Sequence, residues 1–249
     1  MRTHNVVFVV GAPGAGKTTA LRSLALPSDY QTPDTEVRWT LKDEFAFIGH
    51  YENKTLDGGD RVARHANLLC LEYWKRNILP NPNYRITFLD GEMYLWSRIL
   101  ESLRGDLSFV KPDEEHYLPG GRYSKSYAQI LSGDPSRFPT LPGAGRNFPP
   151  DRIQVSCIYL YVSPEVSLAR RRAREASAGA GETINSDLHM RTAASKQRNF
   201  AEKFKGSGDG ELPFFMEATP SPNYLELNVE NLRPEEVTKR VERYVRGLK

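Results

Sequence analysis

The sequence is poor in cysteine and has no long apolar segment. Only Cys70 and Cys157 occur among 249 residues, each within an apolar pattern. This argues against a disulfide framework or a cysteine metal cluster, and we expect two reduced thiols in the core. No apolar run approaches the roughly 20 residues of a membrane-spanning helix. The first five residues lead directly into a strand-like stretch with no space for a signal peptide, so we expect a cytoplasmic protein.

Charge of neither sign dominates the chain. The formal net charge is +3, which is too small to indicate nucleic-acid binding by itself. Its distribution is uneven, because residues 168–205 contain nine Lys or Arg against four Asp or Glu. The mean hydropathy of -0.55, with 39% apolar and 26% charged residues, is typical of a soluble globular domain. Because positive charge is concentrated in residues 168–205, a polyanion would be held at this segment.

Apolar patterns predict an alternation of strands and helices in one domain over residues 1–249. Continuous apolar runs predict buried strands at 6–10, 85–89, 153–162 and 224–229, and the alternation at 37–48 predicts a hairpin or two short strands. Helical spacing follows these runs at 17–26, 62–73, 93–103, 164–174, 188–204 and 237–248. The pattern predicts an α/β fold with a parallel sheet of about five strands and helices on both faces. Residues 105–150 predict an irregular insertion.

A phosphate-binding motif lies between the first predicted strand and helix. Residues 11–18 read Gly-Ala-Pro-Gly-Ala-Gly-Lys-Thr and satisfy G-x-x-x-x-G-K-[ST]. Glycines let backbone N–H groups converge on phosphate oxygens, and the helix N-terminus adds a positive dipole end. A glycine turn without a nucleotide would not require a Lys and a Thr in register. The motif predicts a nucleoside triphosphate site formed by Gly11, Ala12, Pro13, Gly14, Ala15, Gly16, Lys17, Thr18 and Thr19.

Two side chains of this motif have predicted chemical roles. Lys17 should neutralise the β- and γ-phosphates, and the Thr18 hydroxyl should ligate Mg²⁺. Residues 53–57, Asn-Lys-Thr-Leu-Asp, have one residue too many for the N-K-x-D motif of GTPases and lie too early in the chain. A compact chain with a basic helix pair after its P-loop resembles the kinases related to thymidylate and nucleoside kinases. In that group a lid stands where this chain has residues 168–205.

Four further segments carry a narrower resemblance. They read Ile-Gly-His-Tyr at 48–51, Leu-Asp-Gly-Gly-Asp-Arg at 56–61, Phe-Leu-Asp-Gly-Glu at 88–92 and Leu-Ala-Arg-Arg-Arg-Ala-Arg at 168–174. About two thirds of the chain resembles the bacteriophage 5-hydroxymethyluracil-DNA kinases. The resemblance implies phosphorylation of a base hydroxymethyl group in DNA, within a phage-infected bacterial cell. The chain departs from this pattern at Gly59, where a hydroxyl residue is common, and at Glu92, where Asp is common.

Acidic residues follow the second predicted strand. Asp90 ends that strand beside the P-loop strand, where its carboxylate would hold Mg²⁺ directly or through water. The alternative is that Asp90 caps the following helix. Glu92 is a candidate base or substrate-binding residue, and the alternative is an exposed acid at a helix start.

The resemblance also implies roles around residues 50–61. Asp60 would accept the proton of the acceptor hydroxyl or orient it, and Arg61 would hold a phosphate of the substrate. Asp60 could instead be a helix N-cap. Tyr51 and His50 are candidates to stack on a base, although an aromatic at a strand end is more often part of the core.

Two arginines of the basic segment share one helix face. Arg170 and Arg174 are four residues apart, so a lid helix would direct both toward the migrating phosphoryl group. The alternative is a solvated basic face.

The sequence therefore predicts an ATP- and Mg²⁺-dependent P-loop phosphotransferase. Its leading acceptor is a hydroxyl of a modified base in DNA. One alternative is a free nucleoside or nucleoside-monophosphate kinase, which needs a closed small-molecule pocket rather than an open basic groove. The other is a regulatory protein that binds a nucleoside triphosphate and hydrolyses it slowly.

Overall fold

A computed structural model describes most of the predicted strands and helices. The described residues are 2–33, 37–52, 58–59, 62, 66–91, 141, 149–177, 187–202, 204–205 and 223–248. The helix expected at 93–103 and almost all of the insertion expected at 105–150 lie outside them.

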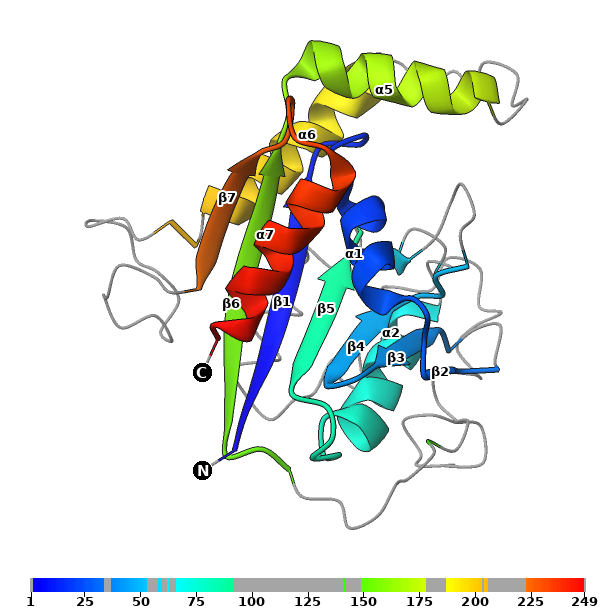
Figure 1. Ribbon diagram of the computed structural model, residues 1–249, viewed down its shortest axis with the longest axis vertical. Helices are drawn as coiled ribbons and strands as arrows, with labels where there is room; N and C mark the ends of the chain where they lie inside the picture. Colours follow the sequence, from blue (N-terminus) through cyan, green and yellow to red (C-terminus); the bar gives the residue numbers. More distant parts are fainter. Residues whose placement is uncertain are drawn as a thin grey trace, which may run out of the picture.

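A seven-stranded sheet forms the centre of the molecule (Figure 1). Its order is β2-β3-β4-β5-β1-β6-β7, with bounds Tyr30–Gln31, Trp39–Lys42, Phe45–Ile48, Ile86–Asp90, Thr3–Gly11, Arg152–Tyr161 and Tyr224–Asn228. The prediction of about five strands was too low. Five neighbouring strands, β4-β5-β1-β6-β7, are parallel to one another. The hairpin adds β3 antiparallel to β4, and the short β2 pairs antiparallel with β3 at the edge of the sheet.

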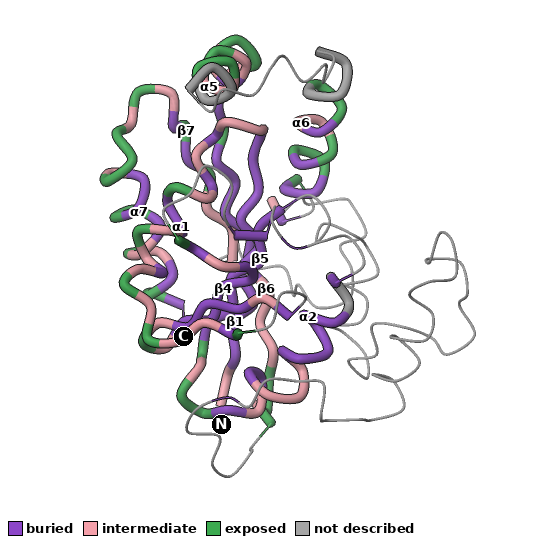
Figure 2. The backbone as a smooth tube through the Cα atoms, turned by 90° about the vertical axis from the view of Figure 1, so that its right-hand side faces the viewer, coloured by how far each residue is buried: buried purple, intermediate pink, exposed green. Residues whose placement is uncertain are grey.

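Helices cover both faces of the sheet, because β1 is apolar on both faces. Val7 and Val9 face a core completed by α1 (Lys17–Ala25) and α7 (Pro234–Arg246). Val6 and Phe8 face the opposite core. This second core is completed by α2 (Asn67–Tyr73), its π-helical continuation Trp74–Ile78, and α6 (Asp187–Glu202). Figure 2 shows the buried strands between these helices, and β1 is the strand on which both layers depend.

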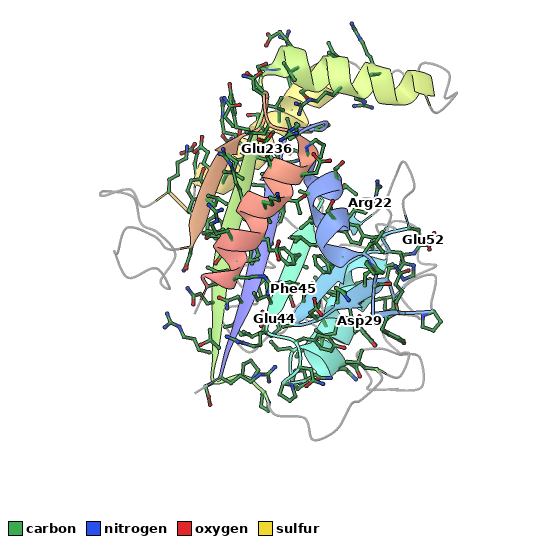
Figure 3. The ribbon with its side chains drawn as sticks, in the orientation of Figure 1. Arg22, Asp29, Glu44, Phe45, Glu52 and Glu236 are labelled. Atoms are coloured by element: carbon green, nitrogen blue, oxygen red, sulfur yellow. The ribbon has the colours of Figure 1, made fainter. Side chains whose placement is uncertain are left out.

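One helix lies across the end of the sheet instead of on a face. Helix α5 (Pro164–Ser177) begins after Ser163, with the predicted proline as its first residue, and crosses above the upper ends of the strands (Figure 1). Figure 3 labels Glu236, in the first turn of α7, near the upper end of the sheet, and the arrowheads of β5 and β6 in Figure 1 point toward this end. The carboxyl ends of the parallel strands therefore face α5.

The cysteines and the helices agree with two expectations from composition. Cys70 and Cys157 are free thiols in the core, and burial raises the pKa of the Cys157 thiol. Among the helices that the structure describes, none has the length and apolarity needed to cross a membrane.

A buried polar cluster lies at the other end of β1, away from α5. His4 Nε2 and Thr87 Oγ1 are joined by a hydrogen bond of 2.8 Å, and Trp74 Nε1 donates to the same hydroxyl oxygen at 2.7 Å. Burial, assisted by the charge of Arg2, lowers the pKa of His4 to about 3. His4 is therefore neutral in the folded protein at neutral pH.

We predict that His4 makes folding stability fall with acid. An unfolded histidine has the ordinary pKa of 6.5, so below pH 6.5 the unfolded chain binds a proton that the folded chain does not, down to about pH 3. At pH 5 this difference lowers the free energy of unfolding by about 2 kcal/mol relative to pH 7. Urea unfolding of wild type and His4→Gln at both pH values measures it. Equal losses in the two proteins would show that His4 is not the cause.

Candidate active site

The P-loop connects the end of β1 to the start of α1. Gly14 and Gly16 have φ values of +86° and +84°, which glycine adopts without strain. Gly16 is the N-cap of α1, no side chain caps this end, and the first turn contains no acidic residue. The N–H groups at the start of α1 are therefore presented to an anion rather than to a capping side chain.

Lys17 points back to its own loop. Its ammonium donates to the carbonyl oxygen of Gly11 at 2.8 Å and to that of Ala12 at 3.4 Å. The side chain is only 8% exposed, because its aliphatic part packs under the loop it contacts. Lys17 is thus a buried cation at the P-loop. To bind a phosphate, its ammonium would exchange its hydrogen bonds with these carbonyl oxygens for hydrogen bonds with phosphate oxygens.

Helix α5 contacts the P-loop through the side chains of Ser167 and Arg170. Ser167 Oγ donates to the carbonyl oxygen of Pro13 at 2.5 Å, and Arg170 Nη1 approaches that of Gly14 at 3.5 Å. A side chain at position 14 would place its Cβ 2.9 Å from the carbonyl oxygen of Ser167. A glycine at position 14 is therefore required by helix packing as well as by backbone conformation.

Arg170 joins three segments of the chain. Besides Gly14, its guanidinium donates to the carbonyl oxygens of Val229 at 3.0 Å and Glu230 at 2.9 Å, after β7. The Glu230 carboxylate accepts from Ser163 N at 2.6 Å. Hydrogen bonding from the Ser163 side chain and from its backbone N–H, together with the charge of Arg170, lowers the pKa of Glu230. In this conformation Arg170 links the P-loop to the segment that follows β7. Its contact with phosphate stays a prediction. The side chain of Arg174, also on α5, lies outside the described residues.

Asp90 lies at the end of β5, beside the P-loop strand. Its Cα pairs with that of Val9, two residues before the P-loop begins. The residue is 1% exposed, and its Oδ1 accepts hydrogen bonds from Gly59 N at 2.8 Å and Tyr51 Oη at 3.4 Å. Asp90 therefore fixes the segment at Gly59 against the edge of the sheet that carries the P-loop.

The departure at Gly59 has a steric cause. A Cβ at this position would lie 2.1 Å from the carbonyl oxygen of Asp90. Gly58 and Gly49 are packed equally closely, since a Cβ on Gly49 would lie 2.1 Å from the carbonyl oxygen of Gly58. The double glycine lets residues 58–59 lie directly on the ends of β4 and β5.

Tyr51 and His50 are both held by β2 and the sheet. The Tyr51 ring is fully buried, with Phe47 packed edge-on at 5.9 Å. In this conformation it does not offer a face to a base, and its hydroxyl instead meets Asp90. His50 Nε2 lies 3.2 Å from Thr32 Oγ1, and its ring is half-buried. Asp60, Arg61 and Glu92 lie outside the described residues.

Gln197 on α6 is a site residue that was not predicted from the sequence. Its Oε1 accepts a hydrogen bond from Gly11 N at 2.5 Å. The signal was available, because Gln197 is a polar position on an otherwise apolar stripe at helical spacing, Ala193, Phe200, Ala201 and Phe204.

Thr18 and Asp90 are oxygen donors suited to Mg²⁺, which is bound by a few protein oxygens together with substrate phosphates. Thr18 is in the first turn of α1, and Asp90 ends the strand next to β1. The part of the chain that the structure describes contains no cluster of three or more His, Cys, Asp or Glu side chains arranged for a metal. The donor set fits an ion bound mainly through a nucleotide.

Comparisons with known proteins give weak similarities. No protein-family model matches the chain, and no curated protein is similar in sequence. A deoxyadenosine kinase from M. mycoides with dCMP and dCDP is 11% identical, covering 98% of this chain and 100% of that one, with a TM-score of 0.41. The same enzyme with dATP is 14% identical, covering 97% and 99%, with a TM-score of 0.40. TM-scores below 0.5 do not establish a shared fold, so the P-loop α/β assignment rests on this chain's own sheet order and loop.

We predict that Lys17→Met removes most nucleotide-dependent activity while the fold persists. Methionine retains the buried aliphatic length but supplies no charge at the developing phosphoryl transition state. Loss of such a group costs about 10²- to 10³-fold in kcat. ATP turnover and the melting temperature measure the two effects. Lys42→Met, which removes a cation paired with Asp29 on the surface, is the control and should turn over normally.

Proposed function

We propose that the protein is an ATP-dependent kinase that transfers the γ-phosphoryl group to a hydroxyl. The carrying observation is a P-loop with an uncapped helix N-terminus, a lysine at its base and a buried carboxylate at the next strand end. These are the parts that phosphoryl transfer requires, since its catalysis is mostly positioning and electrostatic stabilisation.

The chain's own residues would divide the work. The N–H groups of the P-loop would bind the β- and γ-phosphates, and Lys17 would exchange its carbonyl partners for phosphate oxygens. Thr18 and Asp90 would hold Mg²⁺, which offsets negative charge on the phosphates when bound. The acceptor oxygen forms a bond to the γ-phosphorus while the bond to the β,γ-bridging oxygen breaks, and ADP leaves. Asp60 is the proposed acceptor of the hydroxyl proton.

The proposed acceptor is a hydroxymethylated base in DNA, with a free nucleoside or nucleotide as the alternative. The motifs at 48–51 and 56–61 and the exposed cations of α6 support a polymer. The similar solved structures are of a deoxyadenosine kinase, which agrees better with the alternative. A polymer should contact α6 through its phosphates, whereas a free nucleoside has none to offer.

Transfer of labelled phosphate tests the proposal. The protein is incubated with γ-labelled ATP and Mg²⁺ in three parallel reactions, containing duplex DNA with 5-hydroxymethyluracil, unmodified duplex DNA, or free thymidine and its monophosphate. We expect label in the modified DNA alone. Label in the free compounds would assign the alternative acceptor. Hydrolysis of ATP with no labelled acceptor would contradict the kinase proposal and leave a regulatory NTP-binding protein.

A DNA acceptor also predicts strong dependence on salt. Replacing three exposed cations of α6 by glutamine, at Arg191, Lys196 and Arg198, should weaken binding to the modified duplex. It should reduce the slope of log affinity against log salt by up to about 3, because each lost phosphate contact releases about one counterion fewer.

A matched control makes the same change of charge on the opposite face of the sheet. Exposed Lys239, Arg240 and Arg243 on α7 are replaced by glutamine. This variant should retain the wild-type slope. Equal slopes in both triple variants would show that α6 does not contact DNA phosphates.

A further inference from the structure

The first residue of the P-loop has its main-chain groups directed toward β5. Asn5 N donates to the carbonyl oxygen of Arg85, which is on the β5 side of β1. Backbone direction alternates along a strand, so Gly11, six residues later, presents its N–H and C=O to the same side. Pairing with β5 ends at Val9 and Asp90, whereas pairing with β6 continues to Gly11.

Among the described residues, none extends β5 beyond Asp90 to pair with Gly11. Gly91, the last described residue after β5, has a φ of +96°. Side chains replace the missing strand. Gln197 Oε1 accepts from Gly11 N at 2.5 Å, and Lys17 Nζ donates to Gly11 O at 2.8 Å. Gln197 and the P-loop lysine therefore bind the same residue of the cradle.

Packing of α6 on β1 holds Gln197 in place. Phe200 and Phe204, on the same stripe, lie 5.1 Å and 6.4 Å from the Phe8 ring, centre to centre. Gln197 is one turn earlier on α6, toward the end of β1 that carries the P-loop, and is 4% exposed. Since a backbone N–H can only donate, the atom facing Gly11 is the amide oxygen and not the nitrogen.

We propose that Gln197 is a positioning residue for nucleotide binding, which extends β1 by one hydrogen bond and so fixes where the P-loop begins. This inference rests on the proposed binding of a nucleoside triphosphate at the P-loop. With Gly11 fixed, the following N–H groups keep their direction toward the phosphates, and the carbonyl that holds Lys17 keeps its place. Helix α6 thereby supports the phosphate site through a single side chain.

Two variants at this position separate the hydrogen bond from packing. Gln197→Leu keeps a side chain of similar size but has no acceptor for Gly11 N. Gln197→Glu keeps an acceptor oxygen but brings a negative charge to the cradle. The matched control is Ile78→Val, which removes a buried methylene from the same core at the end of the helix that continues α2, outside α6 and the P-loop. For each protein, the Kd for ATP with Mg²⁺ is measured by calorimetry and the melting temperature is measured without ligand.

We expect Gln197→Leu to weaken ATP binding by about 10-fold, the size of one lost buried hydrogen bond. Gln197→Glu should melt closer to wild type than Gln197→Leu yet bind ATP more weakly, because its charge repels phosphate. Ile78→Val should lower the melting temperature and leave Kd within about 2-fold. An unchanged Kd in Gln197→Leu would overturn the proposal, as would equal weakening of binding in Ile78→Val.

The readout keeps this inference separate from the kinase proposal. ATP binding is measured without any acceptor, so a wild-type protein that binds ATP but labels no acceptor would contradict the kinase proposal only. Conversely, full transfer activity with no difference in Kd among the variants would remove the role of Gln197 and leave the kinase proposal intact.

Discussion

The direction of four consecutive carbonyl groups determines the phosphate site. The oxygens of Gly11 and Ala12 accept from Lys17, that of Pro13 accepts from Ser167, and that of Gly14 faces Arg170. Each carbonyl is thus bound by the protein itself. The N–H groups of Gly11 and Ala15 donate to Gln197 and to the Ala12 carbonyl oxygen, so an anion would be bound by the N–H groups at the start of α1. The cradle is therefore built by the side chains around it as much as by its glycines.

The sequence predicted the parts of this site that depend on neighbouring residues. The motif at 11–18 lies between a strand and a helix because β-branched residues precede it and Pro27 ends the helical pattern. The hairpin at 37–48 and the proline start of α5 are equally local. The number of strands was underestimated, because β2 has two residues and exists only by pairing with β3. A two-residue strand has no periodicity to detect.

Contacts between distant segments could not be predicted in the same way. Gln197 and Gly11 are 186 residues apart, and the packing of α6 on the sheet, with Phe200 and Phe204 against Phe8, brings them together. The sequence indicated Arg170 as a basic residue of a lid, but its partners are the carbonyl oxygens of Gly14, Val229 and Glu230. A charge pattern predicts where the cationic side chains lie in the sequence. Their hydrogen-bond partners depend on the tertiary fold, which decides which main-chain carbonyl oxygens are not used within a strand or helix.

The position of Lys17 affects binding and transfer differently. Without an anion, the ammonium lies close to the positive end of α1, and two carbonyl oxygens of the P-loop offset this repulsion. A bound triphosphate must replace these contacts, so part of the attraction between Lys17 and phosphate is lost in breaking them. That cost is paid on binding, before the transition state. In the proposed phosphoryl transfer, further charge that develops on the phosphoryl oxygens would meet a lysine already released, and its stabilisation would affect kcat rather than affinity.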